Sequence, residues 1–132
     1  MVESFWAIPD VTDLRTPLSI LREQAAALTD QTKGTLVGLV GTENWDDGNI
    51  KIKLDISVPA LNDYRYRILS YDQPLLELYP GRLYPSPEPN VGEGSYKPIG
   101  DEAAFVSSVK AILSSERVKR SLAALLAQAK EV

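Results

Sequence analysis

The sequence predicts a single α+β domain in which helices pack on one face of an antiparallel sheet. Three patterns support this fold class: an amphipathic helical stretch after Thr16, strand-like runs with a two-residue period in the middle, and two further helical stretches at the end. With 132 residues and 44% apolar content, the chain has the size and composition of one globular domain. We therefore expect one domain over residues 1–132.

The first helix is predicted from its end signals. Thr16 suits the N-cap, Pro17 suits the first helical position, and Gly34 suits the position just beyond the end. Apolar residues at helical spacing form one stripe, made of Leu18, Leu21, Ala25 and Leu28. Residues 1–13 precede this helix as a lead-in, in which Phe5 and Trp6 are expected to cover part of the core.

The strand predicted next, over 35–42, consists of apolar pairs separated by glycines and is expected to be buried on both faces. No phosphate-binding glycine motif is present, so the glycines of this stretch, Gly34, Gly38 and Gly41, more simply mark a bulge or a close approach of another backbone, such as the first helix. Asp47-Gly48 then predicts a hairpin turn, because both central positions of a type I′ turn need positive φ.

The run Ile50–Val58 alternates strictly between apolar and polar residues, which predicts a strand with one buried face and one wet face. A third strand is expected from Tyr64 to about Tyr71. The favoured register places apolar residues opposite apolar ones and opposite charges together. Its predicted pairs are Val58–Tyr64, Ile56–Tyr66 and Leu54–Ile68 on the inner face, with Asp55–Arg67 and Ser57–Arg65 on the outer face.

A fourth strand, over 75–79, is predicted to complete a four-stranded antiparallel meander. Residues 80–100 contain five prolines and four glycines, so we expect a long Pro/Gly-rich loop there, either mobile or used for recognition. Two C-terminal helices follow, capped by Asp101 and Ser115. The helices are expected to pack on one sheet face.

Composition excludes several classes of function. The chain has no cysteine and no histidine, which rules out disulfides, thiol nucleophiles, histidine general bases and zinc sites built on either residue. No run of about 18 apolar residues and no signal peptide is present, so we expect no membrane partner and a cytoplasmic, bacterial-type domain. We expect no cofactor and no enzymatic activity.

Charge argues against a nucleic-acid partner. The net charge is −4, and residues 1–50 carry eight acidic and only three basic side chains. The outward basic residues of the middle strands surround Asp55, so cross-strand ion pairs on a solvated face explain them more simply than RNA binding. The acidic turn lacks the ligand spacing of a calcium loop, because Trp45 and Leu54 stand where oxygen ligands are needed.

These observations favour a non-enzymatic protein-binding module. Its most concrete form is a small acidic inhibitor, of the immunity-protein or antitoxin kind, that masks a basic partner. The predicted protein-binding residues are the acidic turn and two tyrosines of the loop: Glu43, Trp45, Asp46, Asp47, Tyr84 and Tyr96. Two alternatives stay open: a structural or assembly subunit that self-associates through the wet sheet face or the C-terminal helices, and a small-ligand site lined by Tyr84 and Tyr96.

Overall fold

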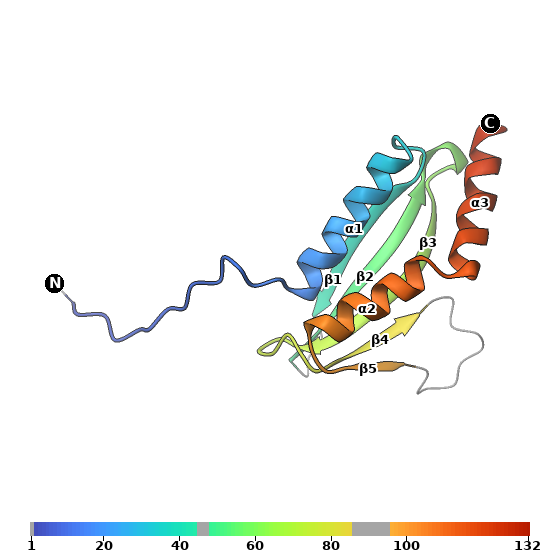
Figure 1. Cartoon of the computed structure of the whole chain (residues 1–132). Coiled ribbons are helices and arrows are strands. Elements are labelled where there is room, and N and C mark those ends of the chain that lie inside the picture. Colours follow the sequence, from blue (N-terminus) through green and yellow to red (C-terminus); the bar gives the residue numbers. More distant parts are fainter. Residues whose placement is uncertain (1, 45–47, 86–95) are drawn as a thin grey trace.

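A computed structural model describes residues 2–44, 48–85 and 96–132, and over these residues the chain is an α+β protein with three helices and a five-stranded antiparallel sheet (Figure 1). The strands follow one another across the sheet in the order β1-β2-β3-β4-β5. The elements, in chain order, are α1 (Pro17–Gln31), β1 (Val37–Asn44), β2 (Asn49–Val58), a 3-10 turn η1 (Pro59–Leu61), β3 (Tyr64–Pro74), β4 (Gly81–Pro85), β5 (Lys97–Ile99), α2 (Glu102–Leu113) and α3 (Glu116–Lys130).

The helix ends are those that the sequence predicts. The Thr16 side chain accepts a hydrogen bond from the Ser19 amide at 3.0 Å, and the Thr16 amide donates to Ser19 Oγ at 3.1 Å. These two bonds form a capping box, and Pro17 occupies the first helical position. Asp101 caps α2 and Ser115 caps α3 through the same kind of bond to the third helical amide. These caps fix where each helix begins.

Helix α1 lies very close to β1 at Gly38. A Cβ atom built on Gly38 would stand 2.5 Å from the Ala25 Cα, which is well inside van der Waals contact. The Gly38 amide donates instead to Thr29 Oγ1 of α1 at 2.9 Å. The expected close approach of the helix to this strand is therefore confirmed. The expectation that this strand is buried on both faces is wrong, because β1 is an edge strand whose last four residues, 41–44, are exposed.

The register between β2 and β3 is the predicted one at the end near η1 and shifts in the middle. Val58 pairs with Tyr64 and Asp55 with Arg67, as expected. Leu54 then pairs with Leu69 instead of Ile68, because a β-bulge leaves Ile68 without an opposite partner. Without the bulge, the predicted alternation would place Tyr71 on the outer face, but in the structure Tyr71 lies in the core.

The predicted strand over 75–79 is wrong, since β3 continues to Pro74 and the chain then turns. Leu76 is almost fully exposed, so this apolar run is not a core strand. Side chains of β3 satisfy the carbonyl groups of the turn: Gln73 Nε2 donates to Glu77 O, and Tyr71 Oη donates to Leu78 O. This side-chain bonding replaces the strand ladder that residues 75–79 would otherwise need.

The fourth and fifth strands lie inside the stretch that the sequence predicts as a loop. β4 (Gly81–Pro85) pairs with β3, and β5 (Lys97–Ile99) pairs with β4. Proline is compatible with these strands because Pro85 ends β4 and Pro98 lies in an edge strand, where a missing N–H is tolerated. The rest of the predicted loop, 86–95, lies outside the described residues.

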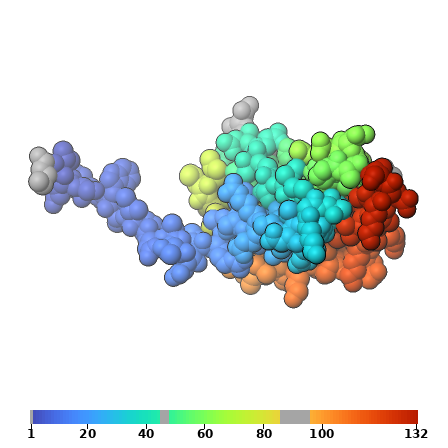
Figure 2. All heavy atoms as spheres, turned by 90° about the horizontal axis from the view of Figure 1, so that it is seen from above, coloured from blue at the N-terminus to red at the C-terminus, as the bar shows by residue number. Residues whose placement is uncertain are grey.

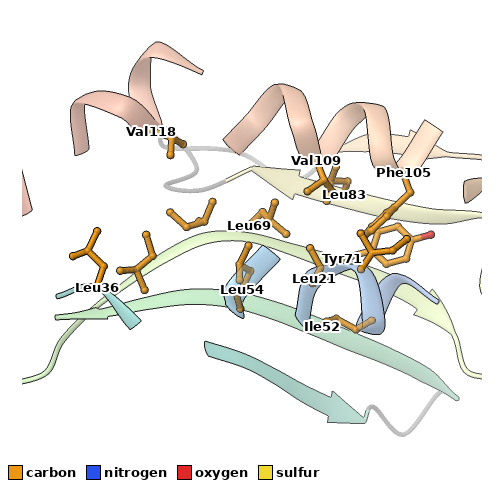
Figure 3. Close-up of a cluster of buried hydrophobic side chains, with 14 of the residues drawn as sticks. Leu21, Leu36, Ile52, Leu54, Leu69, Tyr71, Leu83, Phe105, Val109 and Val118 are labelled. Atoms are coloured by element: carbon orange, nitrogen blue, oxygen red, sulfur yellow. The ribbon is translucent and has the colours of Figure 1, made fainter. Parts of the chain in front are cut away.

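One cluster of buried hydrophobic side chains joins the helices to the sheet (Figure 3). The ring of Phe105 from α2 stands edge-on to Tyr71 of β3, with ring centroids 4.8 Å apart, and Tyr79 packs on both rings. Burial, with a smaller contribution from the Glu102 carboxylate, raises the pKa of Tyr79 to about 12. The Tyr79 hydroxyl is buried and makes no hydrogen bond in the structure.

Residues 2–14 form an extended arm that runs away from the rest of the molecule (Figures 1 and 2). Phe5 and Trp6, expected to cover the core, are 91% and 84% exposed. That expectation is wrong: the core is closed without the arm, by the inner faces of α1, α2 and α3.

The close helix–strand approach predicts that Gly38→Ala destabilises the fold. The added Cβ would meet backbone atoms of Ala25, which cannot move aside without shifting α1, so we expect a loss of about 2–3 kcal/mol in the free energy of unfolding. Gly41→Ala is the matched control in the same strand, where the added Cβ meets no atom within 4 Å. Urea unfolding checks this, and equal midpoints for the two variants would contradict it.

The aromatic cluster predicts opposite effects for two Tyr→Phe variants. Tyr79→Phe removes a buried hydroxyl without a hydrogen bond, so stability at neutral pH should be unchanged or higher. Tyr71→Phe removes the bond to Leu78 O and should cost about 1 kcal/mol.

Tyr79→Phe should also change how the stability of the protein depends on pH in alkaline solution. Because the pKa of Tyr79 is about 12 when folded and near 10 when unfolded, its contribution is complete below pH 10 and is lost as the pH rises towards 12. Tyr79→Phe should therefore lose less stability between pH 9 and 11 than the parent protein. Urea midpoints measured across this pH range test the expectation.

Candidate functional site

The outer face is the side of the sheet that carries Lys51, Lys53, Asp55 and Ser57 of β2 and the residues paired with them. The strand register aligns one row of charged residues across four strands with alternating sign. The members of this row, from β1 to β4, are Glu43, Lys51, Asp72 and Arg82. Pro98 of β5 ends the row opposite Arg82.

Ion pairs connect neighbouring strands on this face, as the sequence predicts. Arg67 Nε donates to Asp55 Oδ1 at 2.8 Å, and Lys53 Nζ lies 2.7 Å from Glu43 Oε2. The two pairs differ in burial, because Asp55 is only 7% exposed while the Glu43 side chain is about half exposed. The Asp55–Arg67 pair therefore holds a buried carboxylate, whereas the Glu43–Lys53 pair lies in water.

Tyr84 and Tyr96 lie beside each other at the far end of the outer face. Their ring centroids are 5.7 Å apart, although the residues are separated by the stretch 86–95 in the sequence. Each ring is faced by a cation: Lys51 Nζ is 5.6 Å from the Tyr84 centroid, and Arg82 Cζ is 5.0 Å from the Tyr96 centroid. These distances allow cation–π attraction, which holds both rings in place.

A shallow concavity of about 570 Å³ lies next to this pair. Tyr96 and Arg82 line it together with Asp72 and Asn49, while Tyr84 does not. Of the two tyrosines predicted to line a small-ligand site, only Tyr96 lines this concavity.

The structure places half of the predicted binding residues on one face. Glu43, Tyr84 and Tyr96 all lie on the outer face, with Glu43 at the β1 side and the tyrosines at the β4–β5 side. Trp45, Asp46 and Asp47 lie outside the described residues.

Within the described parts of the chain, no group of three or more acidic residues is arranged to hold a metal ion. Over those same parts, none of the helices is both long and apolar enough to cross a bilayer.

The difference in burial between the two ion pairs predicts different costs for breaking them. Arg67→Ala leaves the Asp55 carboxylate buried without its guanidinium partner and should cost about 2 kcal/mol. Lys53→Ala, the control, leaves Glu43 exposed to water and should cost less than about 1 kcal/mol. Urea unfolding of both variants is the measurement, and an equal loss would show that Asp55 is solvated after all.

The binding role of both tyrosines stays a prediction from the sequence. That Lys51 and Arg82 face their rings was not predicted. The position of Lys51 on the outer face could be predicted, because Lys51 is one of the polar residues of the alternating run Ile50–Val58. The position of Arg82 could not, because β4 was not predicted. Comparison with known proteins finds no matching family model, no similar characterised protein and no similar solved structure.

Proposed function

We infer that this chain is a non-enzymatic protein-binding module whose partner contacts the outer face at Tyr84 and Tyr96. The observation that carries this inference is the contact between two partly exposed tyrosine rings, Tyr84 of β4 and Tyr96 just before β5, whose centroids are 5.7 Å apart. Tyrosine is enriched among the residues that dominate binding energy in protein interfaces. Tyr96 is 36% exposed, so part of its ring is available to a partner.

The pair is preorganised, which favours binding. Both rings are anchored to the sheet through β4 and β5 and are faced by Lys51 and Arg82. Binding a partner over these rings costs little side-chain entropy of Tyr84 and Tyr96, because both rings are already held in place in the free protein. The neighbouring charged row supplies polar contacts around the aromatic centre, as the rim of an interface commonly does.

In the more specific form of this proposal, the partner is basic and the chain acts as an acidic inhibitor of the immunity-protein or antitoxin kind. Support comes from the net charge of −4 and from the acidic balance of residues 1–50. Glu43 is already offset by Lys53 at 2.7 Å. Asp46 and Asp47 therefore carry the attraction to a basic partner in this proposal.

The absence of histidine and cysteine from the sequence supports a binding role over a catalytic one. Among the residues that the structure describes, the groups whose pKa is raised are Tyr71 and Tyr79, which pack beneath α2 in the core. Neither faces the concavity beside Tyr96. Their raised pKa values follow from burial, which is a property of the core and needs no catalytic explanation.

The proposal predicts that replacing either ring weakens binding. The tagged chain is used to capture partners from its host, and native mass spectrometry identifies a stoichiometric complex. Tyr84→Ala and Tyr96→Ala should each weaken that complex by about tenfold or more in titration calorimetry. Tyr64→Ala is the control, since Tyr64 is an exposed tyrosine of β3 whose opposite residue, Val58, belongs to the helix-covered face.

The basic-partner form has a separate outcome. Asp46→Asn combined with Asp47→Asn should slow association, and the effect should shrink as salt is added. Unchanged affinity of both tyrosine variants would overturn the proposed face, and unchanged association of the aspartate variant would overturn the basic partner. Unfolding midpoints equal to the parent's ensure that each loss reflects binding.

A further inference from the structure

The arm of residues 2–14 exposes apolar side chains that a soluble protein ordinarily covers. Phe5, Trp6 and Ile8 are each more than 80% exposed, and further apolar residues of the arm, Val2, Val11 and Leu14, are also exposed. The arm projects away from the molecule (Figure 2). A contiguous exposed apolar segment of this kind marks an interaction site.

A mostly apolar groove of matching character lies between α1 and the helices α2 and α3. It consists of two adjoining depressions of about 350 Å³ and 180 Å³ that share Gln24 and Leu113. Sheet residues form its floor, namely Leu54, Ile56 and Ile68. The groove begins at Arg15, where the arm joins α1, and ends beside Leu28 and Leu122.

The arm and the groove complement each other in length and charge. Residues 5–14 in extended form span up to about 33 Å, which exceeds the roughly 22 Å length of α1 along the groove. The arm carries three acidic residues between its apolar ones, Glu3, Asp10 and Asp13. The beginning of the groove carries the exposed Lys110, and also Arg15, which is paired with Glu23. Apolar side chains can therefore enter the groove while acidic ones remain near Lys110 at its rim.

The junction between arm and helix directs the arm away from its own groove. Thr16 is extended, with φ −90° and ψ 157°, and is held by the capping box with Ser19. Pro17 is buried and sterically disfavours a helical conformation at Thr16. Arg15 is tied to Glu23 at 3.1 Å. A return of the arm into the groove of its own chain would have to reverse the backbone at these restrained residues.

We propose that the arm of one copy docks into the α1–α2–α3 groove of a second copy, and that the exchange is reciprocal. Two arms and two grooves close a twofold-symmetric dimer with no unused arm. Two phenylalanines and two tryptophans alone would bury on the order of 600–1,000 Å². With the groove surface included, this approaches the roughly 1,200–2,000 Å² of a stable interface. The outer face stays free, so this dimer does not depend on the proposed function.

Mass and fluorescence test the exchange together. A Trp45→Phe background leaves Trp6 as the one tryptophan, since the sequence has two. Analytical ultracentrifugation of the full chain should show a dimer that dissociates on dilution, and the Trp6 emission should shift to longer wavelength over the same range. Phe5→Ala combined with Trp6→Ala, assayed by mass, should give a monomer at every concentration.

The groove is tested by a matched pair of substitutions on exposed helix positions. Gln24→Phe fills the groove and should give a monomer, while Gln128→Phe adds the same side chain to the exposed side of α3 and should leave the dimer intact. Circular dichroism establishes that both variants keep the fold.

Mixing two monomeric variants separates exchange from docking within one chain. The arm variant retains its groove and Gln24→Phe retains its arm, so their mixture should form a heterodimer with one arm docked. A monomer whose Trp6 emission is blue-shifted at all concentrations would overturn the exchange in favour of docking within the chain. A monomer with fully solvated Trp6 would overturn it, as would a dimer that survives both variants.

Discussion

The contact between α1 and β1 at Gly38 determines where the first helix lies on the sheet, and thereby one wall of the groove in the helical layer. Because Gly38 has no side chain, the backbone of α1 at Ala25 comes down onto the strand, and Thr29 hydrogen-bonds the Gly38 amide. Helix α1 is thereby fixed over the edge of the sheet. Helix α2 is fixed separately, where Phe105 packs on Tyr71 and Tyr79. The groove between the helices is the space left between these two anchor points.

The two faces of the sheet are stabilised by different physics. The inner face is held by apolar burial against three helices, with Leu54 and Ile56 almost fully covered. The outer face is held by paired charges and aromatic rings. Lys53 and Arg67 face carboxylates, and Lys51 and Arg82 face tyrosine rings. A partner on the outer face can therefore bind without disturbing the apolar contacts of the inner face. The arm and the groove add a third surface on the helical side.

Local chemistry explains which elements could be predicted from the sequence. Helix starts depend on a single cap and its neighbours, so Thr16, Asp101 and Ser115 were sufficient to find them. Strand β2 alternates without a fault, and its pairing with β3 was correct as far as Asp55 and Arg67. The error over 75–79 came from treating an apolar run as buried, although side chains of β3 hold that segment in a turn.

The remaining features depend on contacts between distant residues. Proline and glycine in β4 and β5 oppose strand formation locally, and only pairing with β3 makes these segments strands. The neighbourhood of Tyr84 and Tyr96 follows from that pairing and has no local signal. Exposure of Phe5 and Trp6 was equally hidden, because an apolar residue in a sequence does not reveal whether the core has room for it.

The bulge at Ile68 shifts the alternation of inward and outward side chains along β3 by one residue. One extra residue in β3 reverses the side on which every later residue of that strand points, so Leu69 and Tyr71 face the helices while Ser70 and Asp72 face outward. Strand β4 follows the same shifted alternation, because Tyr84 pairs with Ser70 and Arg82 pairs with Asp72. The aromatic centre of the outer face thus owes its orientation to a residue that lies in the core. Deleting Ile68 would exchange the solvent-facing and core-facing side chains in the later part of β3 and in β4 and β5. The length of β3 is therefore as strongly constrained as its composition.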